Sequence, residues 1–152
     1  MSKIDESFDD SIDEDIQPQI INLQREPDTS STPRIVNLRI INAENVKEES
    51  SNKKFTRYHI ELKQGELIWT VQSRFSVLLQ LKKNLKSLYP ELHPDLPKFP
   101  KKELWGSTKL EVVLKRILMI ERYLNAVINH PTLIQAKLVT MTLSVPPAVV
   151  GV

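Results

Sequence analysis

Four cationic side chains stand out in the sequence, three of them next to a predicted change of secondary structure, and the chemistry open to them is anion binding. Arg74 ends a predicted strand and directly precedes a predicted helix. A phosphate arriving there could meet both the guanidinium fork and the helix N-terminus. Lys101 and Lys102 follow a proline-rich segment, and Arg116 lies at the edge of the apolar face of a later helix. We expect these cations to hold a phosphate-bearing ligand, with Phe75 as an aromatic wall.

Each of these residues also has an ordinary structural interpretation, which the sequence leaves open. Arg74 could be a surface arginine, and Phe75 could simply anchor the following helix in the core. The two lysines could be solvated loop charges. Arg116 could be an exposed helix arginine that pairs with a nearby glutamate.

The sequence shows no constellation for catalysis or metal binding. The chain has no cysteine, which excludes disulfides, thiolate metal sites and a cysteine nucleophile. Its three glycines are isolated, so no phosphate-binding glycine loop is present, and no nucleophile elbow or metal-ligand spacing occurs. We therefore expect no enzymatic activity, no catalytic residue, no metal and no cofactor.

The net charge of +2 over 152 residues conceals an asymmetry along the chain. Residues 1–34 carry a net charge of −6, whereas residues 35–152 carry +8. Such a division indicates an acidic tail joined to a basic domain with an anionic partner: nucleic acid, a membrane or an acidic protein. The N-terminus lacks the apolar core of a signal peptide, and no stretch is apolar enough to span a bilayer, so we expect a cytoplasmic protein.

The charge and hydropathy pattern divides the chain into three parts. Residues 1–33 are acidic and poor in aromatic residues, which predicts a disordered tail. This tail either keeps the protein soluble or competes with ligands for the basic domain, and its only docking patch is the apolar group Ile20, Ile21 and Leu23. Residues 34–145 form the predicted domain, and residues 146–152 are expected to be an unstructured end.

Apolar residues alternate with polar ones over three consecutive segments, around residues 36–40, 58–62 and 67–71. This period of two predicts an antiparallel three-stranded meander with one buried face. The last two strands are expected to form a hairpin around Gly65.

The period becomes helical after the third strand. Leucines recur at helical spacing up to Leu88, and Pro90 ends this helix. Residues 90–100 contain four prolines and predict an extended, polyproline-like loop. Thr108 and Glu111 fit a capping box that opens the longest helix, and a short helix is expected after Pro131. The predicted fold class is α+β: a three-stranded antiparallel meander packed against three helices, with the proline-rich loop between the first and second helices.

Leu104 and Trp105 stand between the proline-rich loop and the long helix without helical or strand periodicity. Exposed apolar residues of this size usually bury in a partner or a membrane, and tryptophan favours the membrane interface. We expect this pair to insert into a membrane; the alternative is that Trp105 folds back onto the domain.

Three motifs in this order resemble the PX (phox-homology) domain. The junction W-T-V-Q-S-R-F-S at residues 69–76 is similar to the family's strand-to-helix junction, and L-P-K-F-P-K-K at residues 96–102 is similar to its proline loop. The third motif, residues 115–131, contains Lys-Arg, then Glu-Arg-Tyr-Leu and His-Pro. Ser73 departs from the family, which usually has an arginine there.

The resemblance implies roles for individual residues. Arg74 matches the family's residue for the 3-phosphate of an inositol lipid, and Phe75 the ring that packs against the inositol. Lys102 matches the residue for the 1-phosphate, with Lys101 as an auxiliary or substitute. Arg116 matches an arginine that contacts ring hydroxyls or the 4-position.

The resemblance implies a phosphoinositide-binding module that directs a protein to endosomal or other cytoplasmic membranes, with phosphatidylinositol 3-phosphate as its expected lipid. One alternative is the PX region of a larger protein, such as a sorting nexin or a phospholipase D-like enzyme. Another is a protein-interaction module that presents the proline-rich loop 94–100 to an aromatic-lined groove. Nucleic-acid binding is disfavoured, because the few aromatic residues show no stacking pattern.

Overall fold

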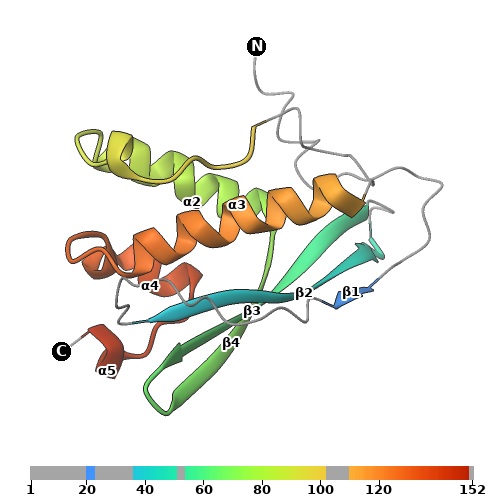
Figure 1. Ribbon diagram of the computed structural model, residues 1–152, viewed down its shortest axis with the longest axis horizontal. Helices are drawn as coiled ribbons and strands as arrows, with labels where there is room; N and C mark the ends of the chain where they lie inside the picture. Colours follow the sequence, from blue (N-terminus) through green and yellow to red (C-terminus); the bar gives the residue numbers. More distant parts are fainter. Residues whose placement is uncertain (1–19, 23–35, 51–53, 102–109, 151–152) are drawn as a thin grey trace.

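The computed structural model describes residues 20–22, 36–50, 54–101 and 110–150. In chain order the elements are four strands, β1 (Ile20–Asn22), β2 (Asn37–Lys47), β3 (Lys54–Gln64) and β4 (Leu67–Arg74), followed by the helices α2 (Phe75–Leu88), η2 (His93–Asp95), α3 (Leu110–Ile128), η4 (Leu133–Gln135), α4 (Lys137–Thr142) and α5 (Pro147–Val150). The strands form one layer and the helices cover one of its faces (Figure 1). The α+β class and the meander of β2, β3 and β4 are as the alternation predicted.

The sheet is antiparallel throughout, in the order β1-β2-β3-β4. Gly65 lies in the β3–β4 turn with a φ of 61°, a left-handed conformation that glycine adopts without strain. The two-residue turn fixes the register, so that Gln64 pairs with Leu67 and Arg57 pairs with Arg74. The hairpin turn thus sets which side chains lie beside Arg74 at the far end of β4.

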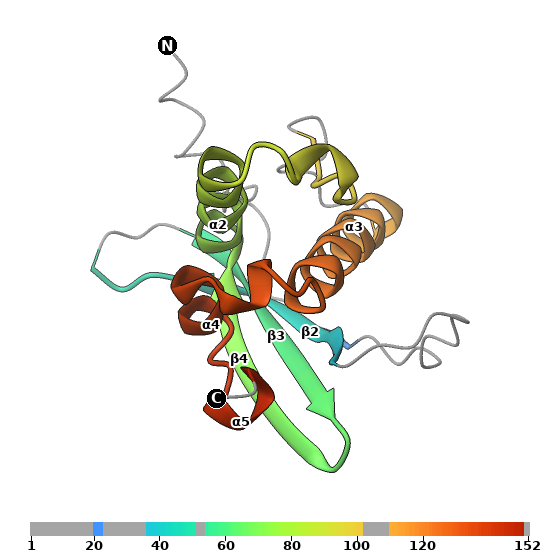
Figure 2. The same ribbon diagram turned by 90° about the vertical axis from the view of Figure 1, so that its left-hand side faces the viewer.

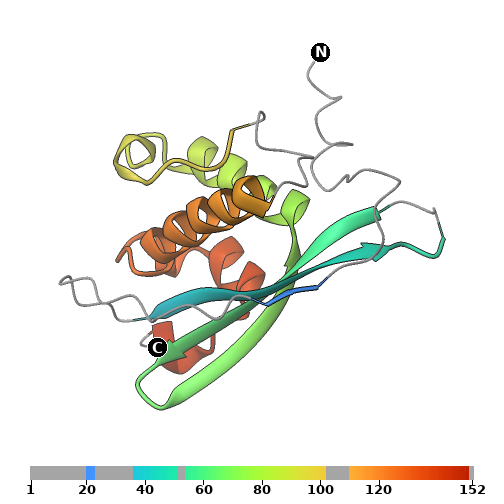
Figure 3. The ribbon, with the colours of Figure 1, turned by 45° about the vertical axis from the view of Figure 1, so that its right-hand side comes forward.

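The core lies between the sheet and the helices. On the covered face, Leu38, Tyr58, Ile60 and Leu62 are fully buried, as their alternation with polar residues predicts. Helices α2 and α3 begin at the same end of the molecule and run in roughly the same direction across this face (Figures 1 and 3). Both helices therefore present their N-terminal ends where β4 ends.

Helix α3 is tied to the outer edge of β2 by polar side chains spaced four residues apart, which we call the α3 seam: Glu121, Asn125 and Asn129. Asn125 accepts a hydrogen bond from the Leu38 N–H (2.9 Å) and donates one to the Leu38 carbonyl (2.8 Å). Asn129 makes the same pair of bonds with Val36, both 2.8 Å long. Glu121 Oε2 accepts a hydrogen bond from the Ile40 N–H (2.8 Å). The seam gives hydrogen-bond partners to backbone N–H and carbonyl groups that would otherwise pair with a neighbouring strand.

Strand β1 pairs with three further residues of the β2 edge (Figure 3). Ile20 pairs with Glu44 and Asn22 with Asn42, beyond an irregularity in β2 between Ile40 and Asn42. The prediction of a tail without structure over residues 1–33 is therefore wrong for residues 20–22. A purely local reading missed β1 because pairing to a distant strand, rather than local propensity, holds so short a segment.

Three further expectations need correction. The C-terminal end is not unstructured over its whole length, because α5 occupies Pro147–Val150 and Val149 is buried in the core. The proline-rich segment is not extended throughout, since it contains the 3-10 helix η2. Leu88, at the end of the predicted apolar stripe, is 59% exposed. None of the described helices is long and apolar enough to cross a membrane.

Candidate functional site

A buried row of three aromatic rings connects the elements that carry the predicted site. Phe75 begins α2, Phe99 belongs to the proline-rich loop, and Tyr123 lies on α3. The Phe75 and Phe99 rings have centroids 5.5 Å apart, and the Phe99 and Tyr123 rings meet edge-on at 5.4 Å. Such pairs add about 0.5–1.5 kcal/mol beyond the area they bury. We call these residues the aromatic bridge.

The aromatic bridge positions the predicted cations through short lengths of chain. Arg74 directly precedes Phe75, and Lys101 follows Phe99 by two residues. Arg116 precedes Tyr123 by seven residues, which places it on the same face of α3 about 10 Å toward the start of the helix. Because α2 and α3 begin at the same end (Figure 1), Arg74 and Arg116 lie toward that common end.

Arg74 lies at the junction predicted from the sequence. It is the residue before α2, with extended backbone angles (φ −102°, ψ 161°), and its side chain makes no cap hydrogen bond. The first turn of α2 contains no acidic residue. The free N–H groups and positive dipole end of a helix favour an anion at such a position.

The guanidinium of Arg74 lies over the ring of Phe55, with its central carbon 4.3 Å from the ring centroid. Arg57 approaches the same ring at 5.9 Å. Phe55 is 9% exposed, so the ring offers Arg74 a largely dry surface. A cation–π contact of this kind orients a guanidinium and contributes about 0.5–2 kcal/mol. Phe55, Arg57 and Arg74 form what we call the basic corner.

Phe75 lies in the core. Its side chain is 1% exposed and packs against Phe99. A ring buried in this way presents almost no surface to a ligand, so the structural interpretation of Phe75 is favoured over the aromatic wall. Its position fixes the residue before it, which is Arg74.

Arg116 is 5% exposed, so it is not the exposed helix arginine of the alternative interpretation. Charged side chains are buried almost only where other groups compensate them. On the same face, Tyr123 is 1% exposed, and its hydroxyl has no hydrogen-bond partner among the described residues. Burial raises the pKa of Tyr123 to about 12.

The proline-rich loop turns part of its surface inward. Phe99 and Pro100 are buried, whereas Pro94, Pro97 and Lys101 are exposed. Lys102, Leu104 and Trp105 lie outside the described residues, and so does Thr108 of the predicted capping box. The roles expected for them, and for the loop as a protein ligand, stay predictions.

Sequence reasoning assigned no role to Phe55 or Phe99. The two-residue turn at Gly65 could have located Phe55, because it pairs Arg57 with Arg74 and places Phe55 next along the same face of β3. Phe99 carries a weaker signal, as the only aromatic residue among the prolines.

Comparison with known families identifies this arrangement of strands, proline loop and helices. The family model of the PX domain matches residues 61–145, more than half of the chain. The chain belongs to the PX domain family. The PX domain is a phosphoinositide-binding module and not a catalytic one.

Solved structures of PX domains share the fold. A designed CISK-PX domain is 32% identical and has a TM-score of 0.58, covering 70% of this chain and 96% of its own. The mouse SNX19 PX domain with a bound sulphate ion is 23% identical and has a TM-score of 0.59, covering 75% of this chain and 100% of its own. The second likeness is one of fold alone.

Curated relatives match over shorter stretches. Human sorting nexin-2 is 36% identical over 77 residues, which cover 44% of this chain and 15% of sorting nexin-2. A probable serine/threonine-protein kinase of Dictyostelium discoideum is 35% identical over 63 residues, which cover 41% of this chain and 3% of the kinase. This PX chain thus spans a small part of the length of these relatives.

Proposed function

We propose that this PX domain binds phosphatidylinositol 3-phosphate and holds its protein on endosomal or other cytoplasmic membranes. Arg74 binds the 3-phosphate, Lys102 the 1-phosphate, with Lys101 beside it, and Arg116 the hydroxyls of the ring. Phe75 contributes by anchoring Arg74 rather than by stacking on the inositol. The similarity to sorting nexin-2 supports a setting in sorting nexin-like membrane transport.

The observation that carries this proposal is the placement of Arg74. Its guanidinium lies on the Phe55 ring at 4.3 Å, and its backbone opens a helix whose first turn has no acidic residue. A bidentate guanidinium and a helix N-terminus together suit a dianionic phosphate monoester, the group that a phosphorylated inositol ring displays.

The test is liposome co-sedimentation with the variants Arg74→Ala and Arg74→Ser. Each variant should lower affinity for liposomes containing phosphatidylinositol 3-phosphate by about 10- to 100-fold, because charge-assisted hydrogen bonds contribute roughly 1.5–3 kcal/mol. Serine supplies the missing N-cap oxygen of α2, so Arg74→Ser should keep the melting temperature close to that of the parent.

Arg57→Ala is the matched control, since Arg57 pairs with Arg74 in the register and approaches the same ring. It removes the same charge one strand away and should lower the affinity by about fivefold at most, as expected of a surface charge near an anionic leaflet. Equal losses for the two arginines would reduce binding to general electrostatics and overturn the assignment of Arg74.

Leu104 and Trp105 are proposed to insert into the membrane beside the headgroup. Trp105→Ala should weaken binding to liposomes and leave the affinity for a soluble inositol phosphate unchanged, because insertion acts only where a bilayer is present. Calorimetry with the soluble headgroup provides the second measurement. A parallel loss of both affinities would show that Trp105 folds back onto the domain.

A further inference from the structure

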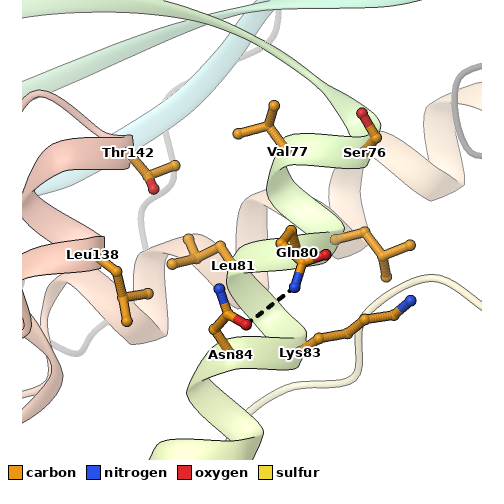
Figure 4. Close-up of a pocket in the computed structure, with 9 residues that line it drawn as sticks. Ser76, Val77, Gln80, Leu81, Lys83, Asn84, Leu138 and Thr142 are labelled. Atoms are coloured by element: carbon orange, nitrogen blue, oxygen red, sulfur yellow. Dashed lines mark hydrogen bonds between the residues drawn. The ribbon is translucent and has the colours of Figure 1, made fainter. Parts of the chain in front are cut away.

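A groove runs between α2 and α4, and it begins at Ser76, two residues after Arg74 of the proposed lipid site. Figure 2 shows these two helices on the side of the molecule opposite to α3. Its volume is about 520 Å³. Figure 4 shows Val77 and Leu81 of α2 facing Leu138 and Thr142 of α4 across it. Val77 is 45% exposed, and polar side chains, among them Gln80 and Asn84, line the groove beside it. The groove therefore offers exposed apolar groups next to polar ones.

The helices that form this groove are entirely without acidic residues. Helix α2 carries Lys82, Lys83 and Lys86, and α4 begins with Lys137. Of these lysines, Lys83 lines the groove itself. An occupant that complements this charge carries carboxylates next to apolar side chains.

The N-terminal segment ahead of β1 has that chemistry, in addition to the patch of Ile20, Ile21 and Leu23 that the sequence analysis singled out. Its bulky apolar residues recur every four positions, at Ile4, Phe8, Ile12 and Ile16. Seven acidic residues stand between them over residues 1–19, against one lysine. A spacing of four places apolar residues about one helical turn apart, the same spacing as Val77 and Leu81 on α2.

The register of the sheet places this segment within reach of the groove. Ile20 pairs with Glu44, Glu44 with Arg57, and Arg57 with Arg74, so one row crosses the sheet from β1 to β4. Three strand spacings amount to about 14 Å. Eight residues separate Ile12 from Ile20 and can span roughly 26 Å. Ile12 can thus reach Val77, which follows Arg74 by three residues, and Phe8 can bind one turn further along.

We propose that the acidic N-terminal segment, residues 4–16, binds its own domain in the groove between α2 and α4, with Phe8 and Ile12 as its apolar anchors and the flanking lysines opposite its carboxylates. The tether makes this site intramolecular, so an effective concentration in the millimolar range keeps even a weak contact occupied. This docking does not depend on the identity of the lipid.

Amide hydrogen exchange of the full chain tests the contact. The double variant Phe8→Ser/Ile12→Ser should exchange several times faster than the parent in α4 (Lys137–Thr142) and in the first turns of α2. The turn of the β3–β4 hairpin around Gly65 should be unchanged. Unchanged exchange in α4 would overturn the proposal, as would increased exchange confined to the β4–α2 junction and the proline loop, which would place the segment on the lipid site.

A second measurement supplies the segment in trans. A synthetic peptide of residues 1–19 should bind the double variant, whose own segment no longer competes, with a dissociation constant on the order of 10–100 μM, weakening as salt rises. Adding Val77→Asp to the double variant should weaken peptide binding at least about tenfold.

The matched control replaces Ile68, which is 53% exposed on β4, with aspartate in the same background. Ile68→Asp should leave peptide binding within about twofold of the double variant. Equal losses for Val77→Asp and Ile68→Asp would overturn the groove assignment. The remaining alternative is that a second copy of the chain fills the groove. In that case light scattering would give a dimeric mass for the parent, and the exchange protection of α4 would disappear on dilution. This result would overturn intramolecular docking.

Discussion

The α3 seam and the basic corner both place polar side chains against the sheet, but they leave those side chains in different states. In the seam, Asn125 and Asn129 each donate to and accept from the backbone of a single residue, Leu38 in β2 and Val36 directly before it. In the basic corner, Arg74 rests on an aromatic ring at the start of a helix that has no side-chain cap. The seam completes its hydrogen bonds within the protein, whereas the corner orients a charge at a helix end suited to an anion.

This difference separates residues that hold the fold together from a residue placed at a helix N-terminus, where an anion is favoured. A buried amide with all its partners contributes to stability, and its loss leaves strand groups unsatisfied. A guanidinium on a ring is positioned without using all of its five N–H donors on that ring. Substitution in the seam should therefore change stability without changing affinity, and substitution of Arg74 should do the reverse.

The largest effect on stability is expected in the seam. Asn125→Ala removes both hydrogen bonds to Leu38 and leaves a buried N–H and carbonyl without partners. The free energy of unfolding should fall by about 3 kcal/mol, measured by urea denaturation. Below the melting temperature, its affinity for phosphoinositide liposomes should match that of the parent.

Asn129→Ala is the matched control for this prediction. Asn129 makes the same two bonds with Val36 but is only half-buried, so water can replace part of what is lost. Asn129→Ala should therefore lower the free energy of unfolding clearly less than Asn125→Ala does. Equal costs for the two alanine variants would show that burial does not set the strength of the seam.

Tyr123 lies between the two regions, because it shares α3 with the seam and contacts Phe99 of the aromatic bridge. Its pKa is raised from 10.0 to about 12 in the folded protein, so the folded state keeps a proton that the unfolded state loses. The free energy of unfolding should therefore fall as the pH rises from 10 to 12, by roughly 2–3 kcal/mol from this residue.

Tyr123→Phe should remove this part of the pH dependence. At pH 7 it should also keep or raise stability, by up to about 1 kcal/mol, because the buried hydroxyl lacks a partner among the described residues. Chemical denaturation at pH 7, 10 and 11.5 compares the two proteins. A loss of stability at pH 7 would show that the hydroxyl is bonded in solution.

The sequence predicted those parts of the fold that local patterns determine. Alternation placed Leu38, Ile60 and Leu62 on the buried face of the meander, and the spacing of Leu78, Leu81 and Leu85 gave the buried face of α2. Arg74 was placed at the start of that helix by the change of period alone. In each case neighbouring residues carry the signal.

The missed features depend on contacts between distant segments. The positions of Asn125 and Asn129 indicate only that they share a helix face, and nothing local identifies the β2 edge as their partner. Strand β1 exists through its pairing with β2. The proline segment has no period from which the burial of Phe99 could be inferred.

The smallest loss of affinity is expected on substitution of Phe55. The size of this loss measures how much the Phe55 ring contributes to holding Arg74. Phe55→Leu keeps an apolar side chain and removes the π face, so headgroup affinity should fall about three- to fivefold, the equivalent of roughly 1 kcal/mol. Stability should change by less than about 1.5 kcal/mol. Phe55→Trp restores a π face of greater strength and should recover the parent affinity. Calorimetry with a soluble inositol phosphate compares the three proteins, and identical affinities for the leucine and tryptophan variants would show that the ring under Arg74 only fills space.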